Sequence, residues 1–169
     1  GSWSSMSRGR IDEISLFASP ADVALRMSLR STWDVVSELV VNAEKTIFIS
    51  CYELSSTDLG QLLHAAILRG VHVDVHMSWD SERPKDETGR FSRSEKNVLG
   101  SLRDAGAKIS ISEMKGRYNH TKAIIADRRQ GIIGSANFSK SGLTKNFEIG
   151  LFVRGPTCSH LIDQFGNLE

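Results

Sequence analysis

Two stretches of the chain carry apolar residues at helical spacing. In residues 29–43 an apolar side chain recurs at alternating steps of four and three, and Ser31 with Asp34 fits an N-terminal capping box. Residues 57–69 place their apolar side chains on one helical face, and Gly70 supplies a C-terminal stop. Further helices are expected at 94–105 and 157–165.

Other stretches have the period of a β-strand. Residues 71–77 alternate strictly between apolar and polar side chains. Helices and strands alternate in the first part of the chain, and strands follow one another closely in the second. This order predicts an α/β domain whose mixed β-sheet is flanked by helices on both faces. Short apolar runs predict further strands at 45–51, 108–112, 120–127, 131–134 and 147–153.

The composition is that of an ordinary globular domain, with 40% hydrophobic and 24% charged residues. The 169 residues suffice for one domain, so we expect a single domain at 7–169 after a disordered tail, left from cloning, at 1–6. No apolar run approaches the roughly 20 residues of a membrane helix, and the N-terminus lacks the apolar segment of a signal peptide. Cys51 and Cys158 lack CxxC spacing, which favours free thiols in a reducing cytoplasm over zinc or a disulfide.

The formal charge of +1 excludes a chain-wide polycation but not a local basic face. Between Lys108 and Lys145, eight bases stand against two acids, a local balance of +6. This segment is either an ordinary surface or a rim that faces a polyanion, with Tyr118 and Phe138 as stacking groups. The charged stretch Asp80–Phe91 is either a solvated loop or a flap that contacts substrate.

Side chains suited to phosphate chemistry concentrate from His120 onward. On a strand, His120 and Lys122 project to the same face. An imidazole beside an ammonium suits a phosphodiester better than an apolar core, because lysine neutralises oxygens while imidazole attacks phosphorus or moves a proton. Ser135 and Asn137 follow Gly134 and are either phosphate-binding donors or simple turn formers.

Two carboxylates accompany this group. Glu148 can hold the second imidazole nitrogen and fix its tautomer. Asp127 either orients active-site groups or bonds backbone at a strand end. His72, Asp74 and His76 alternate on one strand face but spread over roughly 13 Å, so we expect no metal site there.

These residues carry a family resemblance. His120-x-Lys122, Asp127 and Gly134-Ser135-x-Asn137 are spaced as in the HxKx4Dx6GSxN signature of the phospholipase D superfamily. The stretch 146–149 resembles the one that supplies a further glutamate in that family, and 47–73 is similar to its strand–helix–strand entrance. The resemblance covers about residues 30–165.

The resemblance implies a phospholipase D-like fold and a phosphodiesterase that needs no metal and no cofactor. A single motif in a chain of this length is similar to the bacterial endonuclease-like branch, so we expect a nuclease whose substrate is nucleic acid, DNA ahead of RNA. A phospholipid phosphodiesterase and a non-catalytic nucleic-acid-binding module of a larger enzyme stay open as alternatives. The expected catalytic residues are His120, Lys122, Glu148 and Asp127, and the expected phosphate-binding residues are Lys122, Ser135 and Asn137.

The expected reaction is two in-line displacements through a phosphohistidine on His120. The nucleophile and the acid that protonates the leaving oxygen must lie on opposite sides of phosphorus, and one imidazole cannot occupy both places. A second copy of His120 can serve, so we expect a homodimer with one shared active site on its twofold axis.

Overall fold

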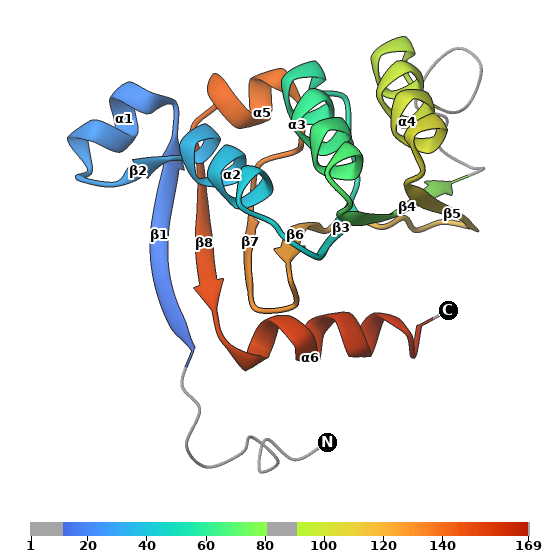
Figure 1. Cartoon of the computed structure of the whole chain (residues 1–169). Helices are drawn as coiled ribbons and strands as arrows, with labels where there is room; N and C mark the ends of the chain where they lie inside the picture. Colours follow the sequence, from blue (N-terminus) through green and yellow to red (C-terminus); the bar gives the residue numbers. More distant parts are fainter. Residues whose placement is uncertain (1–11, 81–90, 169) are drawn as a thin grey trace.

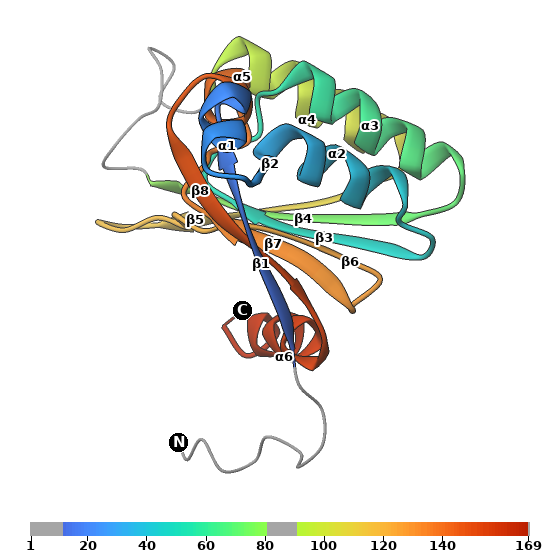
Figure 2. The ribbon, with the colours of Figure 1, turned by 90° about the vertical axis from the view of Figure 1, so that its left-hand side faces the viewer.

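In the computed structural model, which describes residues 12–80 and 91–168, the chain forms an eight-stranded sheet between two unequal helical layers (Figure 1). The strands are β1 (Glu13–Ser19), β2 (Arg30–Ser31), β3 (Thr46–Cys51), β4 (His72–Asp80), β5 (Lys108–Met114), β6 (Lys122–Ala126), β7 (Gln130–Gly134) and β8 (Glu148–Arg154). The helices are α1 (Ala21–Arg26), α2 (Thr32–Val41), α3 (Thr57–Leu68), α4 (Arg93–Ala105), α5 (Lys140–Thr144) and α6 (Pro156–Phe165). Figure 2 shows α1 to α5 on one face of the sheet and α6 on the other, which confirms the predicted fold class.

The sheet is mixed, with strand order β2-β1-β8-β7-β6-β3-β4-β5. β3, β4 and β5 run parallel, because α3 and α4 return the chain over one face before each next strand. β6, β7 and β8 follow one another as antiparallel neighbours. β6 also pairs antiparallel with β3, and β8 pairs antiparallel with β1. The helix–strand alternation and the later run of close strands in the sequence correspond to these two halves.

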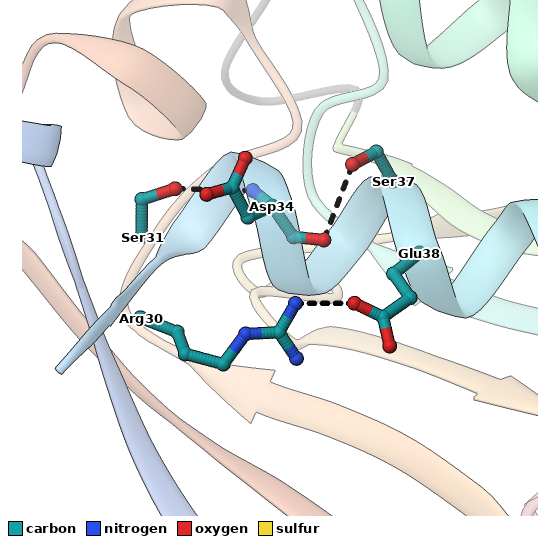
Figure 3. Close-up of polar contacts among 5 residues, drawn as sticks. All are labelled: Arg30, Ser31, Asp34, Ser37 and Glu38. Carbon is teal, nitrogen blue, oxygen red and sulfur yellow. Dashed lines mark hydrogen bonds and ion pairs between the residues drawn. The ribbon is translucent and has the colours of Figure 1, made fainter.

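The start of α2 follows the predicted capping pattern. The Ser31 hydroxyl accepts the Asp34 amide at 3.2 Å and so satisfies one of the free donors of the first turn. The Ser37 hydroxyl donates to the Asp34 carbonyl at 3.2 Å, and the Arg30 guanidinium pairs with the Glu38 carboxylate (Figure 3).

The end of α2 is held from α3. Arg69, which follows the last residue of α3, donates from its guanidinium to the carbonyls of Val40, Val41 and Ala43 at 2.7, 3.0 and 3.1 Å. The Val40 carbonyl also accepts the Ala43 amide at 3.3 Å, whereas Val41 and Ala43 lie at and beyond the end of the helix, where following amides run out. Gly70 then adopts a φ of +99°, which favours glycine and confirms the predicted stop.

Two hydrophobic cores lie on the two faces of the sheet. The larger packs α2, α3 and α4 onto the sheet, with Val36, Leu63 and Ile124 fully buried. The smaller joins Phe48, Ile125 and Cys158 to the apolar side of α6. Cys51 and Cys158 are buried and form no disulfide.

Four elements escaped prediction, namely β1, α1, β2 and α5. Three of them are too short for a period to develop, at six, two and five residues for α1, β2 and α5. β1 has an alternating pattern, but its Ile14 and Leu16 are exposed, so it lacks the buried run that marks the central strands. The expected tail at 1–6 lies outside the described residues, and so does the expected loop or flap Asp80–Phe91 except for its two end residues. Of these, Asp80 ends β4 and Phe91 is buried in the larger core.

Candidate active site

The predicted site residues lie where β3 and β7 end and where β6 and β8 begin, on one side of the sheet. Cys51, the last residue of β3, pairs with Lys122, the first residue of β6. Gly134 at the end of β7 pairs with Gly150, two residues into β8 from Glu148. Because antiparallel neighbours begin and end at the same edge, Lys122, Gly134 and Glu148 are brought together there.

His120 and Lys122 lie side by side. Lys122 Nζ is 3.3 Å from His120 Nδ1 and donates to the His120 carbonyl at 2.9 Å. β6 begins at Lys122 rather than at His120, so the imidazole belongs to the segment that leads into the strand. The Tyr52 amide donates to the Thr121 carbonyl at 3.1 Å and extends the pairing of β3 and β6 as far as this segment.

The surroundings favour an uncharged imidazole. Burial, and then the positive charge of Lys122, lower the pKa of His120 below its ordinary value. Burial also lowers the pKa of Lys122, although the charges of Glu148 and Cys51 oppose that shift. A neutral imidazole beside a cationic group is the state that a nucleophile for phosphorus requires.

Ser135 links β7 to β8 through hydrogen bonds on both sides. Its hydroxyl donates to Glu148 Oε2 at 2.8 Å and accepts the Ile149 amide at 3.1 Å, while its own amide donates to the Ile149 carbonyl at 3.0 Å. In the described part of the chain Glu148 forms no hydrogen bond with His120. Glu148 is bonded to Ser135 and acts on Lys122 through its charge, and its predicted role as histidine partner stays a prediction.

Two glycines allow the turn after β7 to pack closely. A Cβ on Gly134 would lie 2.8 Å from Gly150 Cα, and a Cβ on Gly142 would lie 2.2 Å from the Asn137 carbonyl oxygen. The Asn137 side chain is held in this tight turn, and its Oδ1 is buried without a hydrogen-bond partner among the described residues. Such an unsatisfied atom is uncommon in a native protein and calls for a functional explanation.

Asp127 lies apart from the other predicted site residues, and its contacts favour the second of its two predicted roles, a bond to backbone at a strand end. It follows the last residue of β6, roughly 16 Å along the strand from Lys122. Its carboxylate accepts the backbone amides of Glu44, Lys45 and Thr46 at 3.0, 2.6 and 3.0 Å. Burial would raise the pKa of Asp127, but these amides and the charge of Arg129 outweigh it and lower the pKa. The contacts are those of the alternative, structural role.

The two predicted stacking groups differ in position. Phe138 is 1% exposed and belongs to the larger core, so it offers no ring to a ligand. Tyr118 packs beside His120, and the centroids of the two rings are 5.5 Å apart. Tyr52, which no motif singled out, lies 5.0 Å from the His120 ring and 5.1 Å from Tyr118. Only the pairing of β3 with β6 brings Tyr52 to this place.

Part of the basic segment is free to meet an anion. Arg128 pairs with Asp163 at 2.6 Å and is thereby neutralised. Six other bases are exposed and form no ion pair with any residue in the described ranges, and three of them lie three residues from His120, Asn137 or Glu148 along the chain. The six are Lys108, Lys115, Arg117, Arg129, Lys140 and Lys145, of which Arg117, Lys140 and Lys145 are the three near the site.

Among residues 12–80 and 91–168, no group of three or more His, Cys, Asp and Glu side chains is arranged to hold a metal ion. On β4, His76 Nε2 lies 3.2 Å from Asp74 Oδ2, so these two pair with each other. Within the same ranges no helix is long and apolar enough to cross a bilayer.

Comparison with known proteins places this site in a family. The family described as "Cardiolipin synthase, PLD-like domain" matches residues 36–168, which include His120, Lys122, Ser135, Asn137 and Glu148. The chain belongs to the phospholipase D-like domain family. Members of this superfamily act as phosphodiesterases, in agreement with the chemistry of the site.

Relatives of this phospholipase D-like domain include longer proteins. DISARM protein DrmC of Bacillus paralicheniformis is 28% identical over 142 residues, which cover 80% of this chain and 54% of DrmC. Cardiolipin synthase 2 of Bacillus anthracis is 32% identical over 126 residues, or 72% of this chain and 23% of the synthase. The domain thus spans about half of the first relative and about a quarter of the second.

Two solved structures share the fold over almost their whole length. The phospholipase D family member Nuc from Salmonella typhimurium superposes with a TM-score of 0.70 at 22% identity and covers 93% of both chains. NucT from Helicobacter pylori gives a TM-score of 0.69 at 18% identity, covering 92% of this chain and 93% of its own. The likeness confirms the phospholipase D-like fold.

Proposed function

We propose that this phospholipase D-like domain is a nuclease that hydrolyses phosphodiester bonds of nucleic acid, DNA ahead of RNA, without a metal ion. The observation that carries the proposal is the contact of Lys122 with His120, at 3.3 Å, in surroundings that lower the pKa of the imidazole. The exposed bases Arg117, Lys140 and Lys145, which form no ion pair with any described residue, supply the attraction for a polyanion.

The proposed reaction has two displacements. The neutral imidazole of His120 attacks phosphorus, and the bond from phosphorus to the leaving oxygen breaks as that oxygen takes a proton from a second imidazole. Water then attacks the phosphohistidine, gives its proton to the second imidazole and releases His120. Lys122, Ser135 and Asn137 bind the non-bridging oxygens, and positioned charges of this kind supply much of the stabilisation of the transition state.

We further propose that the second imidazole is His120 of another copy, in a homodimer with a shared site. An uncovered apolar surface beside the site supports this arrangement. Leu16 and Ile133 both pair with Leu151 across the sheet, so the three side chains form a row on the face that carries α6. Leu16, Ile133 and Ile149 are 52%, 47% and 49% exposed, and the Ile149 amide bonds to Ser135.

Subunit mixing tests the shared site. Excess His120→Ala chains are unfolded and refolded together with the wild-type chain, so that subunits exchange. With a shared site, activity falls roughly as the square of the wild-type fraction. A linear fall, or a fully active monomer by light scattering at the assay concentration, contradicts the homodimer.

The substrate is tested with plasmid DNA, RNA and phospholipid vesicles in excess chelator. We expect cleavage of nucleic acid by the wild type, none by His120→Ala, and full activity for the control His160→Ala, whose imidazole is exposed on α6. Binding of nucleic acid without cleavage would favour a non-catalytic binding module. Activity that appears only on adding Mg²⁺ would contradict the proposed chemistry.

A phospholipid substrate is the second candidate function. Phe147, immediately before Glu148, is 65% exposed, and Ile133 and Ile149 are about half exposed near the same edge. Apolar side chains around a phosphodiester site suit acyl chains as well as a second subunit. Release of a headgroup from vesicles, with nucleic acid left intact, would establish this alternative.

A further inference from the structure

The side chains of Thr121 and Asn119 tie the segment that carries His120 to the sheet. The Thr121 hydroxyl contacts the Ser50 hydroxyl at 2.5 Å, and the larger share of the bonds comes from Asn119. Its amide Nδ2 donates to the Ser50 hydroxyl at 2.9 Å, and its Oδ1 accepts the Thr121 amide at 3.0 Å and the Thr121 hydroxyl at 2.6 Å. The Asn119 backbone amide also donates to the Ser78 hydroxyl. These bonds fix the residues on both sides of His120.

The partners of Asn119 belong to the interior of the sheet. Ser50 on β3 is 0% exposed and Ser78 on β4 is 4% exposed. A buried hydroxyl without a hydrogen bond is costly, so both serines favour this placement of Asn119, with Ser50 contacting the Thr121 hydroxyl as well. The segment before β6 is therefore anchored on two buried strands, although Thr121 and His120 are themselves exposed.

The imidazole is restrained as well as the backbone. Tyr52 and Tyr118 have ring centroids 5.0 and 5.5 Å from that of His120, at interplanar angles of 55° and 66°. The two tyrosine rings are 5.1 Å from each other. Tilted and edge-on contacts at these separations are the arrangements that aromatic rings prefer. With Lys122 at Nδ1, three neighbours define the position of the ring.

We propose that Asn119 and Tyr118 are positioning residues for His120. Asn119 fixes the backbone around His120, and Tyr118 fixes the orientation of its imidazole. The imidazole is therefore already in place to attack phosphorus when the substrate binds. This inference rests on the proposed function of His120 as nucleophile. Misplacing a reacting group by about 1 Å costs on the order of a hundredfold in rate, which sets the size of the effect.

The first test replaces Asn119 by alanine. The rate of covalent adduct formation in a single turnover should fall about tenfold to a hundredfold, while the affinity for a DNA oligonucleotide stays unchanged. The matched control is Asn97→Ala, an exposed asparagine on α4, which should change neither quantity. If Asn119→Ala folds poorly, Ser50→Ala removes one bond to the Asn119 amide and should give a smaller fall of the same kind.

The second test separates the ring of Tyr118 from its hydroxyl. Tyr118→Phe should keep the rate of adduct formation, because the ring contact with His120 remains, whereas Tyr118→Leu should lower it. An unchanged rate in both Tyr118→Leu and Asn119→Ala overturns the proposal. So does a loss of rate that only matches the loss of folded protein, since that is a structural effect.

A readout independent of activity is the titration of the His120 imidazole by NMR. In the wild type its pKa lies below the ordinary value of about 6.5, and in Asn119→Ala it should rise, since the ring moves away from the partial desolvation and the charge of Lys122 that lower the pKa. A pKa unchanged in that variant contradicts the inference. If the wild type cleaves no phosphodiester, the proposed function fails, and this titration still decides whether Asn119 positions the ring.

Discussion

Replacing Asp127 by asparagine should destabilise the fold and leave the chemistry intact. Asparagine keeps the size of the side chain, one acceptor oxygen and the tolerance for the φ of +54° at this position. It removes the negative charge of the carboxylate that accepts hydrogen bonds from the amides of Glu44, Lys45 and Thr46. The change therefore isolates the charge of the carboxylate.

The magnitude follows from these three bonds. A hydrogen bond to a charged group contributes about 1.5–3 kcal/mol to stability, but here three amides share one carboxylate that is only partly buried. We expect Asp127→Asn to lower the free energy of unfolding by about 1–3 kcal/mol. In a domain of this size that corresponds to a fall in Tm of roughly 2–12 °C.

The lowered pKa of Asp127 predicts how its contribution to stability changes with pH. The pKa of Asp127 is lowered in the folded state, so the stabilisation is present above the unfolded pKa of about 3.9 and is lost as pH falls through the folded value. Wild type and Asp127→Asn should differ most near neutral pH and converge in acid.

The assay is thermal or urea unfolding followed by circular dichroism between pH 7 and pH 3. Asp104→Asn is the control, because Asp104 is exposed on α4 and its carboxylate forms no hydrogen bond or ion pair in the described part of the chain. Turnover per folded molecule should be unchanged in Asp127→Asn. Equal stability of variant and wild type at pH 7, or lost turnover with unchanged stability, would refute the structural role.

Three further predictions concern the site. The rate of adduct formation should pass through a maximum in pH, because the attacking imidazole must be neutral while the second imidazole must hold a proton. The lowered pKa of His120 places the rising limb below about pH 6.5, Lys122→Gln should move that limb to higher pH, and a limb that stays in place would argue against the contact. Ser135→Ala should lower the free energy of unfolding by about 0.5–1.5 kcal/mol. It should lower kcat by more than the loss of folded protein in a melting curve accounts for. Arg117→Ala should weaken DNA binding and reduce the slope of log affinity against log salt by about one, whereas Arg128→Ala, whose charge is already paired, should leave the slope unchanged.

The sequence predicted the central elements of the fold because their side chains are buried with a regular period. Strand β4 alternates along its whole predicted length, and α3 ends where Gly70 adopts a positive φ. β1 was missed because part of its apolar face is exposed, and α1 and α5 because they are shorter than two turns of a helix. Periodicity records burial within an element and carries little information on short or half-covered ones.

The site was predicted as far as local spacing could take it. His120 and Lys122 are only two residues apart, so the short separation along the chain keeps their side chains within reach of each other, although His120 precedes β6. The place of Asp127 was open, because its partners are more than 80 positions away along the chain. Tyr52 and Asn119 were missed, since their contacts with the site depend on the pairing of β3 with β6 and on buried serines. A polar residue inside an otherwise apolar strand, such as Ser50, is the signal that could have indicated such an anchor.

The most direct test of the central claim is to look for the covalent intermediate itself. The protein is mixed with an oligonucleotide labelled at the scissile phosphate in excess EDTA and quenched with acid or with base. We predict a labelled adduct that survives base, is lost in acid, maps to His120 in a peptide digest and is missing from His120→Ala. Product that accumulates in EDTA with no adduct at any quench time, and with inversion rather than retention at a chiral phosphorothioate, would contradict a phosphohistidine mechanism.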